Sequence, residues 1–202
     1  MEIVIFTQRV EVVESYDERR DCADQAIPLF IKKCGYIPVP LPNVIDNLYE
    51  YIDILKPKGI ILTGGNSLIK YGGNAPERDK TDKELIEIAL KKKLPLYGFC
   101  RGMQSILHYF GCHLSQIQGH VARRHAIINV DGIRLREVNS YHNQACMVPD
   151  IKEPIRTLAQ TEDGVAEWIR HGTMPIMGTM WHPEREREFS VEDIQMIREL
   201  FQ

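Results

Sequence analysis

The first part of the chain alternates short apolar runs with longer segments whose apolar residues recur at helical spacing. The short runs predict buried strands, and the helical spacing predicts amphipathic helices beside them. The predicted strands are 2–7, 36–41, 59–62 and the run that begins at Leu96. The predicted helices are 21–33, a segment capped by Asn43, a segment from Thr81 to Lys93, and the segment that follows Cys100. Because strands and helices alternate, we expect a parallel sheet covered on both faces.

Prolines and polar segments modify this pattern. Pro28 stands inside the predicted helix 21–33, where a proline costs about 3 kcal/mol, so we expect a kink or a restart there. Two prolines in 36–41 remove hydrogen-bond donors and place that strand near an edge of the sheet. The polar segments without a clear period, which are typical of loops, are 8–18 and 66–80.

The pattern changes after Gly111. Asp131-Gly132 lies between two strand-like runs and strongly indicates a β-hairpin. No repeat, low-complexity segment or linker interrupts the chain, so we expect a single domain over 1–202. The runs that predict strands in this part are 126–130, 133–138, 155–160, 165–170 and 174–180, and a last helix begins after Ser190.

Composition limits the classes of function. The chain has 202 residues, of which 44% are hydrophobic, so it is long enough to bury a sizeable core. The net charge of −3 argues against a strongly basic face, and hence against nucleic acid as a partner. No apolar run approaches the roughly 20 residues of a membrane helix, so we expect no membrane association. The apolar residues before Gln8 are too few for a signal peptide.

The five cysteines are scattered along the chain, and no two of them form a CxxC pair. This usage favours reduced thiols in a cytoplasmic protein over a disulfide framework or a zinc site. His120 and His125 have no cysteine or carboxylate at ligand spacing, so we expect no metal there. Cys112 and Cys146 are expected to lie in the core.

One stretch combines strand, sharp turn and helix around a single cysteine. Apolar residues from Leu96 lead into Gly98-Phe99-Cys100-Arg101-Gly102, and helical spacing follows. This is the pattern of a nucleophile elbow with cysteine in place of serine. The glycines leave room for the tight turn, and the helix N-terminus favours thiolate over thiol at Cys100. A buried structural cysteine is the alternative, but the flanking glycines favour the elbow.

A cysteine nucleophile needs a base within hydrogen-bonding reach and a third group that orients the base. His182 follows a predicted strand, and Pro183 keeps a helix from forming at once. In an extended segment, residues two apart point to the same side, so Glu184 is placed to hold the His182 ring while the ring faces Cys100. Residues Glu186 and Glu188 of the charged run that follows are expected to be solvated.

An acyl-transfer site also needs N–H donors for the oxyanion of the tetrahedral intermediate. The backbone N–H of Arg101, directly after the nucleophile, is one candidate. The backbone at Gly64-Gly65 is the other, because glycines let the main chain approach a ligand closely. Both loops, like the loop at His182, follow predicted parallel strands, where ligands bind in open α/β sheets.

These residues carry a resemblance to a known family. Gly98-x-Cys100-x-Gly102-x-Gln104, followed by Trp181-His182-Pro183-Glu184, resembles the class I glutamine amidotransferase family, and more narrowly its γ-glutamyl hydrolase branch. Gly64-Gly65 and Asn139-Ser140-Tyr141-His142 add to the match, which spans nearly the whole chain. The resemblance implies an α/β fold: a flavodoxin-like three-layer sandwich with a central, mostly parallel sheet and an added antiparallel ribbon.

The resemblance also implies roles for individual residues. The catalytic triad is then Cys100, His182 and Glu184. The oxyanion donors map to the main chain of Gly65 and Arg101, beside Gly64. The positions that recognise the γ-glutamyl group map to Gln104 and to Asn139, Ser140 and Tyr141. No cofactor is implied.

The implied activity is the hydrolysis of a γ-glutamyl amide, a small-molecule substrate, through a γ-glutamyl thioester on the cysteine. The triad contacts only the γ-glutamyl half, so the amine half stays open. Some family members are glutaminase subunits that pass ammonia to a partner synthetase, while others are free-standing hydrolases, including the γ-glutamyl-aminobutyrate type. A partner synthetase is therefore possible but not required.

Two segments resemble those of small family members associated with bacterial surface polysaccharides. They are 16–21 and 120–125, and each contains an arginine pair. Guanidinium groups match phosphate geometry, so these arginines are candidates for pyrophosphate contacts. For each arginine, a solvated charge or an internal ion pair is the favoured interpretation. The four residues are Arg19, Arg20, Arg123 and Arg124.

A rival from another class is a non-catalytic domain of the same fold in which the elbow cysteine is a redox sensor. That interpretation leaves Gln104 and Glu184 without a role. Peroxide sensitivity without γ-glutamyl turnover, unaffected by His182→Ala, would support it.

Overall fold

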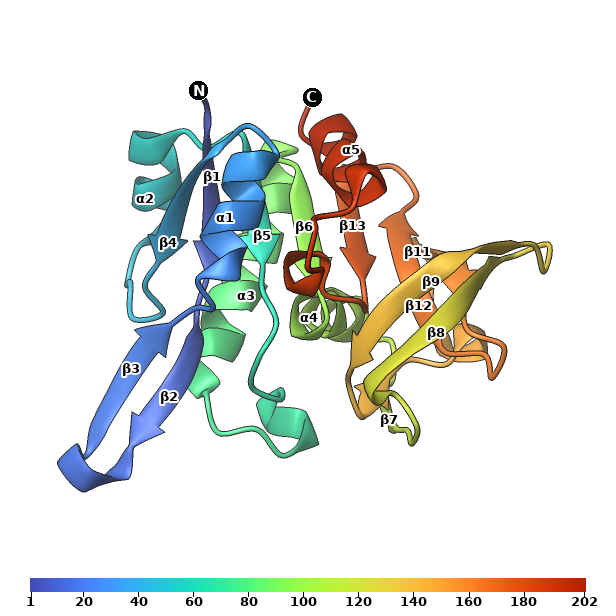
Figure 1. The fold of residues 1–202 in the computed structure, drawn as a ribbon. Coiled ribbons are helices and arrows are strands. Elements are labelled where there is room, and N and C mark those ends of the chain that lie inside the picture. The colour runs from blue at the N-terminus through green and yellow to red at the C-terminus, as the bar shows by residue number, and fades with distance from the viewer.

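The computed structural model describes residues 1–202, and a nine-stranded sheet runs through it (Figure 1). The strand order is β4-β1-β5-β6-β13-β12-β11-β8-β9. Neighbouring strands are parallel from one edge to β13, in the order β4 (Ile37–Leu41), β1 (Ile3–Thr7), β5 (Gly59–Leu62), β6 (Leu96–Phe99) and β13 (Ile176–Thr179). The remaining pairings are antiparallel, through β12 (Ala166–His171), β11 (Ile155–Gln160), β8 (Val121–Asn129) and β9 (Arg134–Tyr141). The proline-containing strand β4 lies at the edge, as predicted.

Helices cover both faces of the parallel strands, which confirms the three-layer sandwich. One core cluster packs helices α1 (Ala26–Lys33) and α5 (Val191–Leu200) against the sheet. A larger cluster lies on the opposite face, where α2 (Leu48–Leu55), α3 (Pro76–Lys92) and α4 (Arg101–Tyr109) pack. No helix combines the length and the apolar character needed to cross a bilayer.

The antiparallel strands form the added ribbon. Strands β8 and β9 pair across the Asp131-Gly132 turn, which confirms the predicted hairpin, and extend away from the helices in Figure 1. A small cluster around Trp181 joins the ribbon to α5 through Met196. A separate two-stranded pairing, β7 (Ser115–Gln116) with β10 (Gln144–Ala145), lies near the end of the ribbon.

The predicted loop 8–18 is wrong. Strands β2 (Arg9–Val13) and β3 (Glu18–Cys22) form an antiparallel hairpin that projects from the sheet (Figure 1). The side chain of Asn66 anchors this hairpin: Val10 N–H donates to Asn66 Oδ1 over 2.8 Å, and Asn66 Nδ2 donates to the Val10 carbonyl over 2.9 Å. The prediction failed because β3 contains almost no apolar residue that would reveal a strand period.

Three helix boundaries also differ from the predictions. Helix α1 begins only two residues before Pro28, so the missing N–H falls in the first turn, where no intrahelical partner exists, and the helix runs uninterrupted. Asn47 caps α2, whereas Asn43 is buried and bonds to Asp21 and Gln8. Helix α3 begins at Pro76, a favoured first position, and therefore takes up part of the predicted loop 66–80.

Candidate active site

The turn between β6 and α4 has the geometry of the predicted elbow. Phe99 ends the strand, Arg101 begins the helix, and Cys100 between them has φ 48° and ψ −110°. A non-glycine residue in this region costs of order 1–3 kcal/mol and persists where the surroundings enforce it. The Cys100 N–H donates to the Thr179 carbonyl over 2.8 Å, which ties the elbow to β13.

Two glycines make the elbow sterically possible, as predicted. A Cβ on Gly98 would lie 2.6 Å from the carbonyl carbon of Gly102, inside the elbow helix. A Cβ on Gly102 would lie 2.0 Å from the carbonyl oxygen of Leu62, on the neighbouring strand. These distances are shorter than any tolerated non-bonded contact, so strand and helix approach this closely only because both positions lack side chains.

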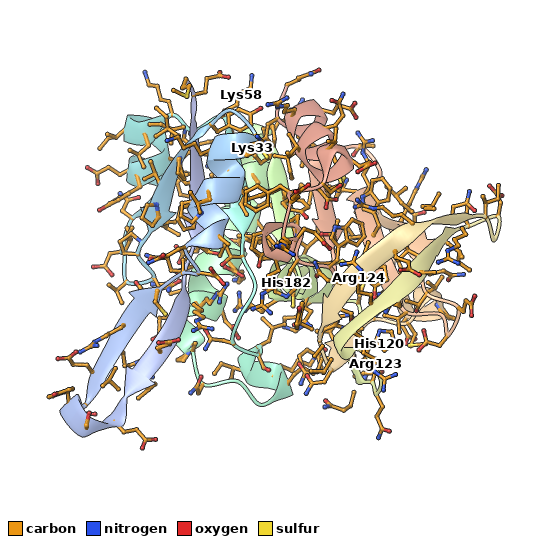
Figure 2. The ribbon with its side chains drawn as sticks, viewed as in Figure 1. Lys33, Lys58, His120, Arg123, Arg124 and His182 are labelled. Carbon is orange, nitrogen blue, oxygen red and sulfur yellow. The ribbon has the colours of Figure 1, made fainter.

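His182 lies directly beside this elbow. It follows β13, and its buried side chain lines the same cavity as Cys100. Phe99 and Tyr141 contact the imidazole edge-on, each with its ring centroid 5.6 Å away. Figure 2 shows His182 near the middle of the molecule, at the end of the sheet opposite to Lys33 and Lys58. The predicted pairing of cysteine and histidine is thus present in the fold.

Glu184 supplies the third group. Its Oε1 lies 2.7 Å from His182 Nδ1, and both side chains are buried. The expected geometry was wrong in one respect: Pro183–Arg185 is a turn of 3₁₀-helix rather than an extended segment. Pro183 fits the first turn of such a helix, so the proline did not prevent it. The tight turn brings the carboxylate back onto the ring of His182.

The charge state of His182 follows from this packing. Burial lowers the pKa of the imidazole, but the negative charge and hydrogen bond of Cys100, together with Glu184, raise it to about 10. A protonated imidazole is therefore the favoured state of His182 at neutral pH. This pair provides a nucleophile and a proton donor at one place.

We expect Cys100→Ala to lower the pKa of His182. The charge of Cys100 is the largest cause that raises the His182 pKa, and the variant lacks it. Burial then lowers this pKa, and only Glu184 opposes the change. NMR titration of the imidazole measures the change. His171, whose pKa burial lowers, serves as an internal control that keeps its titration in both proteins. An unchanged His182 titration in the variant would show that the thiol and the imidazole are not coupled.

The asparagine of the segment 139–141 bonds to the main chain of His182. Asn139 Oδ1 accepts from the His182 N–H over 2.9 Å, and its Nδ2 donates to the His182 carbonyl over 2.8 Å. The same amide donates to Glu186 Oε1 over 2.9 Å, and Glu186 also pairs with Arg124 at 2.9 Å. Glu186 is thus half-buried and bonded, not solvated as expected, whereas Glu188 is exposed.

The predicted substrate-binding residues fall into two groups. Gly65, Arg101, Gln104 and Tyr141 line one cavity together with Cys100 and His182, which we call the inner cavity. Ser140 is fully buried and donates to the His120 carbonyl over 2.5 Å, so its hydroxyl faces away from that cavity. Ser140 and Asn139 therefore support the site through hydrogen bonds to the main chain of His120 and His182, outside the inner cavity.

A second cavity opens on the other side of His182. We call it the hairpin cavity, because Arg9, Glu11 and Cys22 of the β2–β3 hairpin line it together with Gly64 and Arg185. A Cβ on Gly64 would lie 2.8 Å from His182 Cε1, so only glycine allows the loop after β5 to pass so close to the ring. Sequence reasoning missed this cavity because it missed the hairpin.

A buried arginine that sequence reasoning also missed supports the loop after β5. Arg78 donates to the Gly65 carbonyl over 2.8 Å and to the Thr63 carbonyl over 2.7 Å. Burial, reinforced by Arg101, lowers the pKa of its guanidinium. Arg78 lies in α3, so it holds the carbonyls of Thr63 and Gly65 toward that helix. These bonds fix the orientation of the peptide groups around Gly64-Gly65. The local sequence does not indicate that Arg78 is buried or which groups it contacts, because it lies in the segment 66–80 that the sequence predicts as a loop.

The side chain of Arg101 is likewise structural. It is buried in ion pairs with Asp82 and with Asp79, the latter at 2.5 Å. Arg101, at the start of α4, also lines the inner cavity beside Cys100. The first N–H groups of a helix have no partner within the helix, so the Arg101 N–H suits the donor role predicted for it.

The four arginines considered as phosphate contacts line neither cavity. Arg19 pairs with Glu77 at 2.5 Å, Arg20 with Glu18 at 2.5 Å, and Arg124 with Glu186. Arg123 lies on exposed β8, away from His182 in Figure 2. The favoured interpretation, a solvated charge or an ion pair, thus describes all of them. The guanidinium groups that do line the cavities belong to Arg9 and Arg185.

Comparison with known proteins agrees with the geometry. A family model described as glutamine amidotransferase class-I matches residues 26–201. The chain is 36% identical to the γ-glutamyl-CDP-amidate hydrolase of Campylobacter jejuni, covering 96% of this chain and 95% of that protein. It is 28% identical to a γ-glutamyl-γ-aminobutyrate hydrolase of Escherichia coli, covering 74% and 73%. A glutamine amidotransferase structure from Thermotoga maritima shares the fold with a TM-score of 0.65 at 18% identity, covering 91% and 77%. The chain therefore belongs to the class-I glutamine amidotransferase family.

Proposed function

We propose that this protein is a cysteine-dependent hydrolase that cleaves a γ-glutamyl amide and releases glutamate. One observation carries the proposal: a strained elbow cysteine lines the same cavity as a buried histidine, and that histidine pairs with a buried glutamate over 2.7 Å. Nucleophile, proton carrier and orienting carboxylate are the parts that acyl transfer requires.

In the first half of the proposed reaction, the Cys100 thiolate attacks the δ-carbonyl carbon of the γ-glutamyl group. The main-chain N–H groups of Gly65 and Arg101 stabilise the resulting oxyanion. Protonated His182 gives its proton to the departing nitrogen, the C–N bond breaks, and the amine leaves. A γ-glutamyl thioester remains on Cys100, and His182 is neutral.

In the second half, water attacks the thioester and His182 takes a proton from it. Collapse of the intermediate breaks the C–S bond, returns the thiolate to Cys100 and releases glutamate. Glu184 holds the imidazole by Nδ1 throughout and stabilises its protonated form, as the carboxylate of a catalytic triad does. Gln104 and Tyr141, which line the inner cavity, bind the γ-glutamyl group.

The two cavities support a substrate with a large amine half. The inner cavity receives the γ-glutamyl group, and the hairpin cavity on the other side of His182 receives what leaves. Its lining includes Arg185 and Arg9, the latter paired with Glu11 of the same hairpin, and guanidinium groups suit a diphosphate that displaces such a pair. With the 36% identical relative, this favours γ-glutamyl-CDP-amidate as substrate, giving cytidine diphosphoramidate and glutamate. The reaction would then serve phosphoramidate modification of a capsular polysaccharide.

Two further predictions belong to this proposal. The parallel strands and the ribbon share one continuous sheet, which supports a single domain over 1–202. The five cysteines are free thiols, which supports a reducing, cytoplasmic location.

We expect kcat/KM for γ-glutamyl-CDP-amidate to exceed that for γ-glutamyl-aminobutyrate and for glutamine by about 100-fold or more, because only the first substrate places charged oxygens near Arg9 and Arg185. Arg9→Gln and Arg185→Gln should each lower kcat/KM for the nucleotide substrate alone, by about 10- to 100-fold. Arg123→Gln is the matched control, since Arg123 is exposed and lines neither cavity. A coupled assay for released glutamate measures all three substrates.

The same assay separates the alternatives. Equal or better turnover of γ-glutamyl-aminobutyrate would assign the protein to that type of hydrolase. Inactivity on every amide until a synthetase is added would identify a glutaminase subunit.

A further inference from the structure

Three histidines and a glutamate meet beneath the wall of the inner cavity. His120 precedes β8, His125 lies within it, His142 follows β9, and Glu167 lies in β12. The His120 and His142 ring centroids are 5.1 Å apart, and those of His120 and His125 are 5.0 Å apart. Three potential ligand atoms lie within 4.8 Å of one another, one from each of His120, His125 and Glu167. The expectation of no metal considered only carboxylates at ligand spacing along the chain, whereas the fold brings the Glu167 carboxylate from a distant strand.

The polar atoms of this cluster are buried without hydrogen-bond partners. Both oxygens of Glu167, both ring nitrogens of His142, Nδ1 of His120 and Nε2 of His125 belong to this group. Glu167 is fully buried, and His120 and His142 nearly so. An unpaired buried polar group costs about 1–3 kcal/mol, and an ionised one costs more. Because these buried polar atoms lie at one place, a single bound ion or molecule could satisfy several of them at once.

The distances within the cluster are compatible with a shared metal ion. Glu167 Oε1 lies 3.4 Å from His125 Nε2 and 3.2 Å from His142 Nε2, without hydrogen-bond alignment. The His182–Glu184 contact of the same molecule is 2.7 Å. Ligand atoms at about 2.0–2.1 Å from a tetrahedral zinc ion lie about 3.3–3.4 Å apart, which matches the longer contacts.

The surroundings of His120 add a feature common to metal-binding histidines. His120 Nε2 lies 2.9 Å from Asp163 Oδ2, which leaves Nδ1 as the free nitrogen. A carboxylate behind a ligating imidazole fixes its tautomer and strengthens it as a ligand.

We propose that His120, His125 and Glu167, with His142 beside them, form a binding site for a divalent transition metal ion of the zinc class. The donor set of imidazole nitrogens and one carboxylate suits Zn²⁺ rather than Mg²⁺ or Ca²⁺, which prefer oxygen ligands. A surface cavity lined by Gly119, His120, His125 and Asp163 gives an ion access.

The metal acts on structure rather than on the reacting bond. Tyr141 and His142 line the inner cavity, and Ser140 Oγ donates to the His120 carbonyl. An ion held by residues from β8 and β12 therefore fixes the segment that forms one wall of that cavity. This role is independent of the reaction proposed for Cys100.

We expect the purified protein, stripped with a chelator and dialysed against Zn²⁺, to bind about one equivalent of zinc. Elemental analysis gives the stoichiometry, and the thermal unfolding midpoint should rise with bound zinc, since an ion that binds only the folded state stabilises it. Co²⁺ loaded in place of zinc should show the intense visible absorption of a tetrahedral site. Less than about a tenth of an equivalent of bound zinc would overturn the proposal.

Two variants with matched controls test the residues. Asp163→Asn, at an exposed position, should raise the zinc Kd about 10- to 100-fold, while Glu162→Gln next to it leaves the Kd unchanged. His125→Gln should abolish stoichiometric binding, while His113→Gln, an exposed histidine outside the cluster, should not. Circular dichroism of the zinc-free variants confirms that each is folded. Equal zinc binding by wild type and His125→Gln would contradict the assignment.

Discussion

We expect Cys100→Ala to abolish γ-glutamyl hydrolysis, with a loss in kcat of at least about 10⁴-fold. The variant lacks the atom that forms the thioester, so no covalent path remains. Cys100→Ser should be almost as inactive, because a hydroxyl does not ionise beside His182 as a thiol does. Steady-state kinetics measure the loss, and mass spectrometry of denatured enzyme should find the γ-glutamyl adduct on the wild type alone.

Cys34→Ala is the matched control for this prediction. Cys34 is a buried thiol at the end of α1, and burial raises its pKa to about 12, so it is not a nucleophile at neutral pH. The control should therefore keep wild-type kcat. Retention of activity within tenfold by Cys100→Ala would refute the proposed mechanism. Peroxide sensitivity centred on Cys100 without any turnover would instead support a redox sensor.

Gly102→Ala should destabilise the protein by about 3 kcal/mol or more. The added Cβ would lie 2.0 Å from the Leu62 carbonyl oxygen and 2.6 Å from its carbon, so relief requires moving α4 away from β5. These are backbone atoms of a central strand, which cannot rotate aside as a side chain would. Urea unfolding followed by circular dichroism measures the change in the free energy of unfolding.

Gly172→Ala tests whether the effect is specific to the elbow. A Cβ there would lie 3.4 Å from the nearest atom, the Pro154 carbonyl oxygen, which is an ordinary contact. We expect a change within about 0.5 kcal/mol, as for other surface substitutions without special features. A comparable loss in both variants would mean that the tight packing at Gly102 is not what sets the stability of the elbow.

The residues that form the elbow and the His182–Glu184 pair could be predicted because their signals are local. Gly98 and Gly102 flank the cysteine within one short segment, and the apolar period changes from strand to helix at that point. Histidine and glutamate stand two residues apart. Even here the sequence misled in detail, since the 3₁₀ turn at Pro183 replaced the expected extended segment.

The supports of the site could not be predicted, because they depend on contacts between distant segments. Arg78 reaches back to the carbonyls after β5, and Asn139 holds the His182 main chain from the ribbon. The β2–β3 hairpin shows little alternation of apolar and polar residues, because it packs only one residue, Val10, into the interior. Side-chain type alone does not say which partner a buried polar group will find.

The hairpin is separate from the nine-stranded sheet and is anchored to the loop after β5 by the amide of Asn66. The elbow and the histidine belong to the central strands, so the exposed side chains of the hairpin are not part of either. Grafting a hairpin of another sequence onto this scaffold is then a direct route to enzymes that release different amines. Diversification of leaving-group preference by evolution would follow the same route, with the acylation machinery kept intact.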